Sequence, residues 1–245
     1  MPSDMNAPAL LLAAGRGQRM RPLTDDCPKP LLKVRSQPLM CWSLQAMRRS
    51  GIDAALINTA WLGDMIEAEL GAGGGGMPAL IYSHEGRDFG RALETAGGIA
   101  RALPRLADVF WVAAGDVWAP DYSFDRQCAE QFTQSRALAH IWLVPNPEHN
   151  PQGDFCLDEQ GRVYDTAEAG HVRLTYSTIG LYKRSLFEAP WLDIPAGNPE
   201  GVSAALAPLL RQAIACGLVT GAVYTGEWTD IGTPERLAAI NKDKT

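Results

Sequence analysis

The sequence lacks several features that would place it in a membrane or an oxidising compartment. None of its apolar runs in 245 residues approaches the roughly 20 that a membrane-spanning helix needs. Residues 1–6 lack the charged start and the long apolar stretch of an export signal. The five cysteines are odd in number and widely spaced, with no Cys-x-x-Cys pair or histidine-bearing metal pattern. We therefore expect a cytoplasmic protein without a membrane partner, whose cysteines are reduced and structural.

An excess of positive charge is also missing. The chain has 22 Lys and Arg against 28 Asp and Glu, so that its formal net charge is −6. Proteins that bind nucleic-acid polymers usually present a broad basic surface to the phosphate backbone, so we expect no nucleic-acid partner. With 46% hydrophobic residues the chain can bury a sizeable core, and its length predicts a single domain over residues 1–245.

Neither of the two best-known phosphate motifs is complete. The Walker tripeptide Gly-Lys-Ser/Thr is absent, and the third glycine of the dinucleotide fingerprint is replaced by Met20. Nevertheless, the apolar segment 7–14 predicts a buried strand, and Gly15 and Gly17 directly after it allow a tight turn whose N–H groups face a ligand. Four cations that suit phosphate follow this turn: Arg16, Arg19, Arg21 and Lys29.

Strand-like and helix-like segments alternate along the first half of the chain. This order predicts an α/β fold with a Rossmann-like, mostly parallel mixed sheet flanked by helices, and after Asp116 the pattern loosens into shorter strands. The expected strands are 7–14, 54–59, 79–83, 109–114, 138–144, 155–157, 174–182 and 219–224. The expected helices lie near 38–50, 63–70, 95–103, 125–135 and 204–216, and the last begins at Thr233-Pro234 with Thr233 as its N-cap.

Residues 12–32, LAAGRGQRMRPLTDDCPKPLL, resemble the opening of the sugar-1-phosphate nucleotidyltransferases. That motif runs Leu-Ala-Ala/Gly-Gly-x-Gly-x-Arg, then Pro-Leu-Thr, then Lys-Pro-Leu, and every fixed position is filled. The resemblance continues in family order through 94–98, 114–116 and 228–233. Within the family the chain is most similar to the N-acetylmuramate-1-phosphate uridylyltransferases, through 58–63, 115–118 and 207–213.

The resemblance implies a fold of the nucleotide-diphospho-sugar transferase type and a Mg²⁺-dependent reaction. Such an enzyme joins a nucleoside triphosphate to a sugar 1-phosphate and releases pyrophosphate; here it implies UTP and N-acetylmuramate 1-phosphate in cell-wall recycling. About residues 1–120 are then the nucleotide-binding part and about 121–245, a smaller subregion, the sugar-binding part. A mannose-1-phosphate guanylyltransferase and a noncatalytic sugar-nucleotide sensor remain alternatives. The sequence leaves open whether the chain forms a homo-oligomer.

The expected chemistry needs cations more than a base. A phosphate monoester has a second pKa of about 6, so the attacking oxygen is already ionised at neutral pH, and repulsion between anions is the main obstacle. By resemblance, Arg19 contacts the β- and γ-phosphates and Lys29 lies between the phosphates of the two substrates. Asp116, which ends an apolar strand, and Asp230 correspond to the family's Mg²⁺ ligands. Arg16 and Arg21 are equally consistent with pairing to Asp25 and Asp26.

Nucleotide selection is expected near Glu85 and the segment 94–98. A carboxylate accepts hydrogen bonds, so Glu85 suits uracil, thymine or guanine, each of which carries a ring N–H. A solvated loop residue is the alternative for Glu85, and a charge at a helix start is the alternative for Glu94. The expected nucleotide-binding residues are Ala13, Ala14, Gly15, Gly17, Glu85, Thr95 and Gly97.

Sugar contacts are expected from Gly153, where the family's sugar-contacting glycine falls, and from Thr178 on a later strand. A plain turn glycine and an ordinary strand residue are the respective alternatives. Two departures from the family pattern bear on substrate choice. Ala114 stands where relatives often carry a polar residue, and the segment 86–93 is longer than in the uridylyltransferases.

Overall fold

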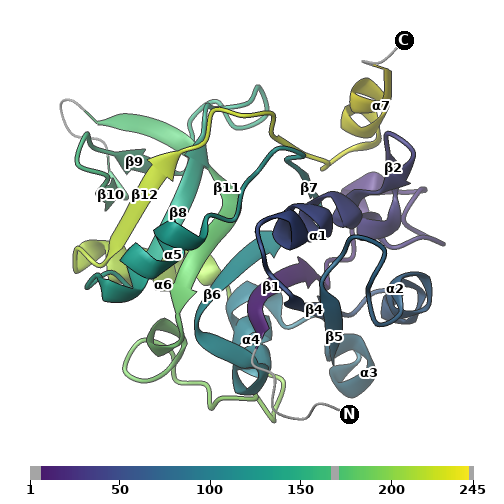
Figure 1. Cartoon of the computed structure of the whole chain (residues 1–245), viewed down its shortest axis with the longest axis horizontal. Coiled ribbons are helices and arrows are strands. Elements are labelled where there is room, and N and C mark those ends of the chain that lie inside the picture. Colours follow the sequence, from purple (N-terminus) through teal and green to yellow (C-terminus); the bar gives the residue numbers. More distant parts are fainter. Residues whose placement is uncertain (1–6, 167–170, 243–245) are drawn as a thin grey trace.

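The computed structural model describes residues 7–166 and 171–242. Its centre is a nine-stranded mixed sheet, whose strands are β1 (Ala7–Ala13), β4 (Ala54–Thr59), β5 (Ala79–His84), β6 (Leu106–Ala114), β8 (Ala139–Val144), β9 (Phe155–Leu157), β10 (Val163–Tyr164), β11 (Val172–Lys183) and β12 (Val219–Val223). The strand order is β10-β9-β11-β6-β1-β4-β5, and β8 also pairs with β11 and with β12 (Figure 1).

The sheet has a parallel half and a largely antiparallel half. β1 lies parallel to β4 and to β6, and β4 lies parallel to β5. On the other side β11 runs antiparallel to β6, β8 and β9, while β12 is parallel to β8. The fold class expected from the sequence is therefore confirmed.

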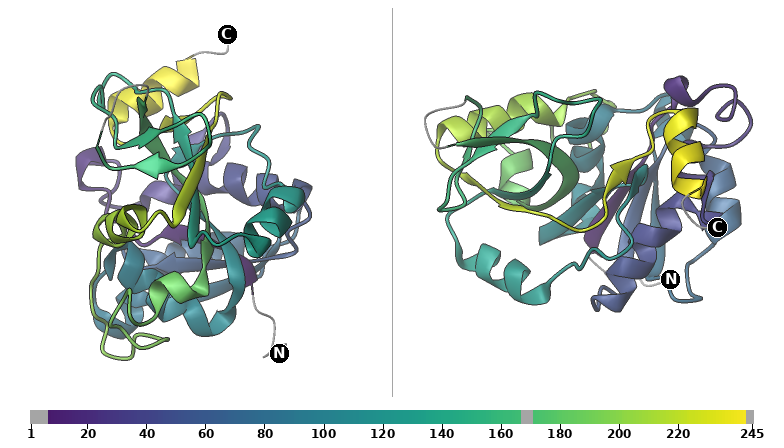
Figure 2. Two further views of the ribbon diagram at one scale, coloured as in Figure 1. Left: turned by 90° about the vertical axis from the view of Figure 1, so that its left-hand side faces the viewer. Right: turned by 90° about the horizontal axis from the view of Figure 1, so that it is seen from above.

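Helices cover both faces of the sheet because successive strand residues point to opposite sides. Leu10 belongs to the core on the side of α4 and α6, whereas its neighbour Leu11 belongs to the core beneath α1, α2 and α5. Seen from above, α1 and α5 lie on one side of the sheet and α6 on the other (Figure 2). The helices are α1 (Leu39–Arg49), α2 (Gly63–Leu70), α3 (Glu85–Phe89), α4 (Glu94–Ala102), α5 (Arg126–Gln134), α6 (Leu206–Ala215) and α7 (Pro234–Lys242).

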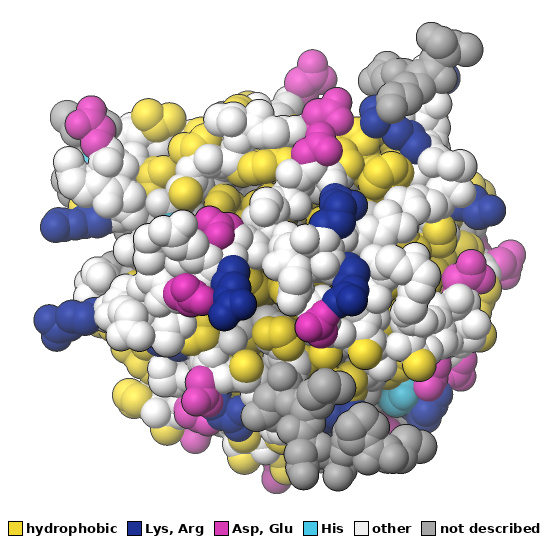
Figure 3. Space-filling model, viewed as in Figure 1, with side chains coloured by type: hydrophobic (Ala, Val, Ile, Leu, Met, Phe, Trp, Pro, Cys, Tyr) yellow, Lys and Arg dark blue, Asp and Glu magenta, His cyan; other side chains and the backbone are white. Residues whose placement is uncertain are grey.

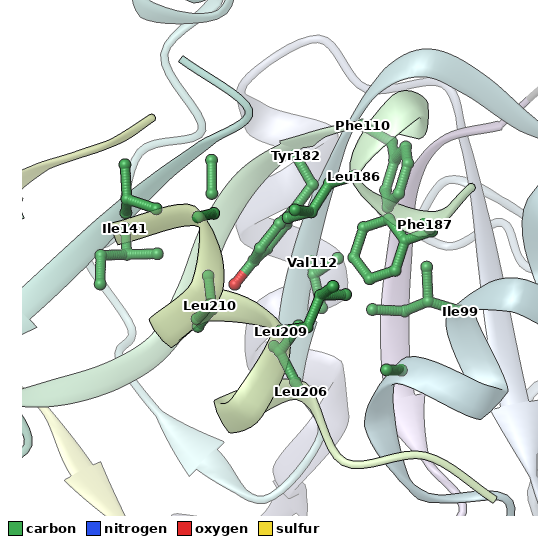
Figure 4. Packing of buried hydrophobic residues seen from close by; sticks show 14 of the residues in the cluster. Ile99, Phe110, Val112, Ile141, Tyr182, Leu186, Phe187, Leu206, Leu209 and Leu210 are labelled. Carbon is green, nitrogen blue, oxygen red and sulfur yellow. The ribbon is translucent and has the colours of Figure 1, made fainter. Parts of the chain in front are cut away.

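The core between α6 and the sheet fixes the position of that helix. Leu209 and Leu210 are buried, and they pack in one cluster with Phe110, Tyr182 and Phe187 (Figure 4). Burying a leucine or a phenylalanine side chain contributes about 1.5–3 kcal/mol, so this cluster holds α6 firmly against the strands.

Short elements complete the fold beside the parallel half. The two-residue strand β7 (Val117–Trp118) pairs antiparallel with β13 (Thr229–Asp230), and a second small pair joins β2 (Lys33–Val34) to β3 (Gln37–Pro38). The last helix begins at Pro234, and the N–H of Arg236 donates to Thr233 Oγ1 at 3.4 Å, as expected of an N-cap. Four single turns of 3₁₀ helix are η1 (Gln18–Met20), η2 (Lys29–Leu31), η3 (Leu103–Arg105) and η4 (Arg184–Phe187).

The sequence did not predict the helix α3, the two-residue strands β2, β3, β7, β10 and β13, or the 3₁₀ turns. The helix α3 forms within the segment 85–93, where the sequence analysis expected only a lengthened connection. Across the described ranges, no helix combines the length and the apolar character that a bilayer crossing requires. On the face shown in Figure 3, acidic side chains lie interspersed with Lys and Arg.

Candidate active site

A cavity of about 570 Å³ lies where the parallel and antiparallel halves of the sheet meet. Ligands of open α/β sheets bind beyond the carboxyl ends of the strands, and β1, β4 and β6 each contribute residues at or next to their ends here. On this side it is lined by Leu12, Ala13, Ala14, Gly15, Lys29, Pro30, Asn58, Val112, Ala114 and Asp116. The opposite side is lined by Ala92, Glu94, Thr95, Asp154, Phe155, Tyr176, Thr178, Ala205, Leu206, Ala207, Leu210 and Arg211.

An ion pair between Lys29 and Asp116 lies in this cavity. Lys29 Nζ is 2.5 Å from Asp116 Oδ2, although the two residues are 87 positions apart. Lys29 begins the turn η2 between two prolines, and only 9% of the residue is exposed. Asp116 follows the end of β6. A strong cation and a carboxylate are thus held together where the phosphates of a ligand would lie.

The chain segments that carry Asp116 and Asp230 are neighbours. β7 pairs with β13, and the N–H of Ile231 donates to the backbone oxygen of Asp116 at 2.9 Å. The carboxylate of Asp230 pairs with Arg236 on α7 and lies 2.9 Å from His149 Nε2. Asp230 does not line the cavity, and no group of three or more potential metal-ligating side chains occurs in the described ranges.

The turn after β1 follows the sequence expectation in part. Ala13, Ala14 and Gly15 line the cavity. Gly17 does not, but it adopts φ 65°, a left-handed conformation that glycine tolerates best, and Thr24 Oγ1 donates to its carbonyl oxygen at 2.8 Å.

The other cations of this segment have different surroundings. Arg16 and Arg21 both pair with Asp25, at 3.3 and 2.8 Å, and the Arg16 guanidinium also stacks 3.5 Å from the centre of the Trp61 ring. Of the alternatives that the sequence left open for Arg16 and Arg21, the structure shows the pairing to Asp25. Arg19 is exposed on η1 and does not line the cavity.

Glu85 does not line the cavity, contrary to the expectation that it reads the base. Its side chain is fully buried, and its carboxylate accepts hydrogen bonds from Asn58 Nδ2 at 2.7 Å and from the N–H of Leu93 at 2.8 Å. Burial raises the pKa of Glu85, while the two hydrogen bonds oppose that rise. The alternative of a solvated loop residue is also wrong, because β5 runs to His84 and α3 turns the chain inward directly after it.

The residue that does reach the cavity from this network is Asn58. It is the last residue but one of β4, and its Oδ1 accepts a hydrogen bond from the N–H of Ala13 at 2.9 Å while its Nδ2 donates to Glu85. Asn58 therefore links the buried carboxylate to the backbone of the turn that lines the cavity.

The start of α4 contributes Glu94 and Thr95 to the cavity, as expected of Thr95. Gly97 does not line the cavity. A Cβ at Gly97 would stand 2.5 Å from the backbone oxygen of Val202, and the Gly97 carbonyl accepts a hydrogen bond from Asn198 Nδ2 at 3.0 Å. Gly97 thus makes room for the segment that leads to α6.

On the sugar side, Thr178 lines the cavity but Gly153 does not. Gly153 is a turn glycine with φ 63°, and a Cβ there would lie 2.7 Å from Asn146 Oδ1. Its neighbour Asp154 faces the cavity instead, with its carboxylate accepting from the N–H of Tyr176 at 2.8 Å and from Asn150 Nδ2 at 3.1 Å.

Comparison with known proteins agrees with this geometry. The nucleotidyl transferase family matches residues 8–245. The chain belongs to this family. Similar relatives of this nucleotidyl transferase include the N-acetylmuramate alpha-1-phosphate uridylyltransferases of Neisseria meningitidis, 43% identical over 94% of each chain, and of Caulobacter vibrioides, 31% identical over 94% of each chain. A crystal structure assigned to a glucose-1-phosphate thymidylyltransferase of Bacillus anthracis shares the fold, with a TM-score of 0.75 and 23% identity over 97% of this chain and 94% of the other.

The lining residues of the nucleotidyl transferase that were not identified from the sequence as site residues include Asn58, Asp154 and Arg211. A signal existed for Asn58, since a polar side chain near the carboxyl end of an apolar strand marks the ligand edge of a parallel sheet. Asp154 and Arg211 lie on a loop and a helix whose sequence pattern gives no such indication.

Proposed function

We propose that this nucleotidyl transferase moves the uridylyl group of UTP to N-acetylmuramate 1-phosphate and releases pyrophosphate. The observation that carries the proposal is the Lys29–Asp116 ion pair in the cavity, with the strand of Asp230 alongside. The substrates are inferred from the names of the two uridylyltransferase relatives, which match over 94% of this chain. Since N-acetylmuramate is a cell-wall sugar, we also propose a role in its recycling.

The reaction is a displacement at the α-phosphorus of UTP. An oxygen of the sugar phosphate, ionised at neutral pH because its second pKa is about 6, attacks and forms a new P–O bond. The bond between the α-phosphorus and the bridging oxygen breaks, and its electrons leave with pyrophosphate. In this proposal Lys29 lies between the two phosphates and offsets their repulsion, while Arg19, exposed on η1 outside the lining of the cavity, takes the β- and γ-phosphates.

The donor set fits a hard divalent cation. Mg²⁺ is commonly held by one or two carboxylates together with substrate phosphate oxygens, and Asp116, directly before β7, and Asp230 on the paired strand β13 offer that set. When bound, Mg²⁺ supplies charge neutralisation of the triphosphate. In the described structure Lys29 and Arg236 hold the two carboxylates, so these cations keep the acids in place before substrates arrive.

The nucleotide contacts are reassigned from the geometry. With Glu85 buried, we propose that the base lies against Ala14, Gly15 and Thr95, which line the cavity. We assign the sugar to the wall that contains Asp154 and Thr178, so that the divide near residue 120 separates nucleotide and sugar functions.

A substrate panel tests the proposal. Pyrophosphate release is measured for UTP, GTP and dTTP, each with N-acetylmuramate, N-acetylglucosamine, mannose and glucose 1-phosphates, with and without Mg²⁺. We expect UTP with N-acetylmuramate 1-phosphate to react best, and EDTA to abolish the reaction. A preference for GTP with mannose 1-phosphate would overturn the substrates, whereas nucleotide binding without any pyrophosphate release would indicate a sensor.

A further inference from the structure

Two cationic side chains line the cavity, and they come from different parts of the fold. Lys29 belongs to the strand-end wall, where it is paired with Asp116. Arg211 belongs to the wall built by α6 and the antiparallel strands, beside Phe155 and Tyr176. The phosphate chemistry proposed above uses the first wall and gives Arg211 no part. A second cation in the cavity, outside the phosphate chemistry, therefore calls for a second anion on the ligand.

Arg211 is held in place by its helix and its neighbours. The adjacent Leu209 and Leu210 are buried in the core, so α6 presents Arg211 from a fixed backbone. Its Nε lies 3.0 Å from Asp165 Oδ1, and its guanidinium carbon lies 5.8 Å from the centre of the Phe155 ring. About half of the side chain is exposed. This arrangement orients the guanidinium group before a ligand binds, which lowers the entropy lost on binding.

The Asp165 contact uses one edge of the guanidinium group. In the described part of the chain, the two terminal nitrogens of Arg211 have no hydrogen-bond partner. Asp154 on the same wall does not compete, because its two carboxylate oxygens accept hydrogen bonds from Asn150 and from Tyr176. A planar guanidinium group with both terminal nitrogens open suits a carboxylate, which it can bind through two parallel hydrogen bonds.

We infer that Arg211 recognises a carboxylate on the sugar and so selects an acidic sugar 1-phosphate over neutral ones. The inference rests on the proposed function, and it names the residue that gives that function its sugar preference. N-acetylmuramate differs from N-acetylglucosamine by a lactyl ether, whose carboxylate is an anion well separated from the anomeric phosphate. With its phosphate near Lys29, the sugar would extend across the cavity toward α6.

The test compares two sugar phosphates that differ only by the lactyl group. Steady-state KM values for N-acetylmuramate 1-phosphate and for UTP are measured, and binding of N-acetylmuramate and N-acetylglucosamine 1-phosphates is measured by calorimetry with a non-hydrolysable UTP analogue present. For Arg211→Gln we expect KM and Kd for N-acetylmuramate 1-phosphate to rise about tenfold to a hundredfold, the range for a charge-assisted hydrogen bond. The KM for UTP and the Kd for N-acetylglucosamine 1-phosphate should stay within about twofold, because neither ligand offers that carboxylate.

Two further variants separate recognition from structure. Asp165→Asn removes the Arg211 ion pair but leaves the guanidinium group, so we expect a much smaller loss than in Arg211→Gln. Arg126→Gln, which breaks an exposed Arg–Glu pair on α5 outside the cavity, should change nothing.

Three results would overturn the inference while leaving the proposed function intact. They are equal wild-type affinity for the two sugar phosphates, equal losses on both in Arg211→Gln, and equal effects of Asp165→Asn and Arg211→Gln. Absence of uridylyl transfer to any sugar phosphate by the wild type would instead overturn the proposed function.

Discussion

The two halves of the sheet build their walls of the cavity in different ways. In the parallel half, several residues that line the cavity lie at the ends of strands: Asn58 is the last residue but one of β4, and Asp116 comes after β6. In the antiparallel half, Thr178 lies inside β11, at a shift in its pairing with β8, and Arg211 comes from a helix.

This difference between the two walls indicates which part of the cavity can change its substrate specificity. Parallel strands all end at one edge, so that wall is fixed by the topology and suits the invariant part of a reaction, the phosphates. The other wall depends on irregularities of single elements, each of which can change without altering the sheet. We assign transfer chemistry to the first wall and sugar choice to the second.

The largest effect that would sharpen this comparison is expected at Asp116. Asp116→Asn removes a charge from the phosphate wall with little change in side-chain volume, so we expect pyrophosphate release to fall about a thousandfold. Unfolding should remain cooperative. Asp64→Asn is the control, because its exposed carboxylate pairs with Arg87 away from the cavity. If the activity of Asp116→Asn stayed within tenfold of the wild type, the assignment of transfer chemistry to the strand-end wall would be wrong.

The next effect is expected at Lys29. Lys29→Met keeps most of the apolar stem but deletes the charge, and we expect kcat to fall about a hundredfold with a smaller change in the KM for UTP, as when one stabilising donor is lost. Lys33→Met, four residues along and exposed on β2, is the matched control. If the loss appeared only in KM, Lys29 would hold substrate without assisting transfer.

A smaller effect is expected beneath the phosphate wall, at Glu85. Glu85→Gln turns one acceptor toward Asn58 or Leu93 into a donor, which should lower the free energy of unfolding by about 1–3 kcal/mol. The KM for UTP should rise too, because Asn58 is no longer held against Ala13. Urea unfolding measures the first effect, and the exposed Glu159→Gln is the control.

The pH dependence of this pair has a defined sign. Burial raises the pKa of Glu85 above its ordinary 4.5, so its protonation is favoured more in the folded than in the unfolded state. The protonated Glu85 side chain therefore contributes its full stabilisation below pH 4.5, and this stabilisation is lost as the pH rises through the raised pKa of the folded state. Urea unfolding of the wild type and of Glu85→Gln measures this. The difference in their free energies of unfolding should shrink from acidic to neutral pH, and a difference that grew would contradict the assignment.

The smallest effect is expected on the sugar wall, at Thr178. Its φ of 63° costs a β-branched residue about 1–2 kcal/mol of backbone strain. Glycine removes this strain, but its greater conformational entropy in the unfolded state cancels part of the gain in stability. Thr178→Gly should therefore raise the free energy of unfolding by up to about 1 kcal/mol in thermal or urea unfolding, while weakening sugar binding. Thr178→Ala keeps the left-handed backbone, so it should weaken sugar binding without the gain. A less stable Thr178→Gly would show that the threonine is not strained.

The sequence predicted the parallel half of the fold closely, because apolar strands there alternate with amphipathic helices. The segments 54–59 and 63–70 match β4 and α2 to the residue. The helix α3 was missed because five residues give too little periodicity, and its start is set by the burial of Glu85.

The candidate site was predicted best where the sequence carries a recognisable motif. The motif residues Lys29 and Asp116 do lie together in the cavity. The interpretation of Glu85 failed because nothing in the pattern shows that Asn58 and Leu93 will take up its carboxylate. Arg211 was missed because a helical arginine is usually a solvated surface residue.

The pairing of β7 with β13 has a consequence for how the protein is made. The strand β13 joins the neighbourhood of Asp116 from far along the chain, and α7 follows it. A ribosome therefore releases the first acid long before the second, and the parallel strands can assemble while the proposed metal-binding pair is still half built. In this scheme the phosphate site is completed only after β13 has been synthesised.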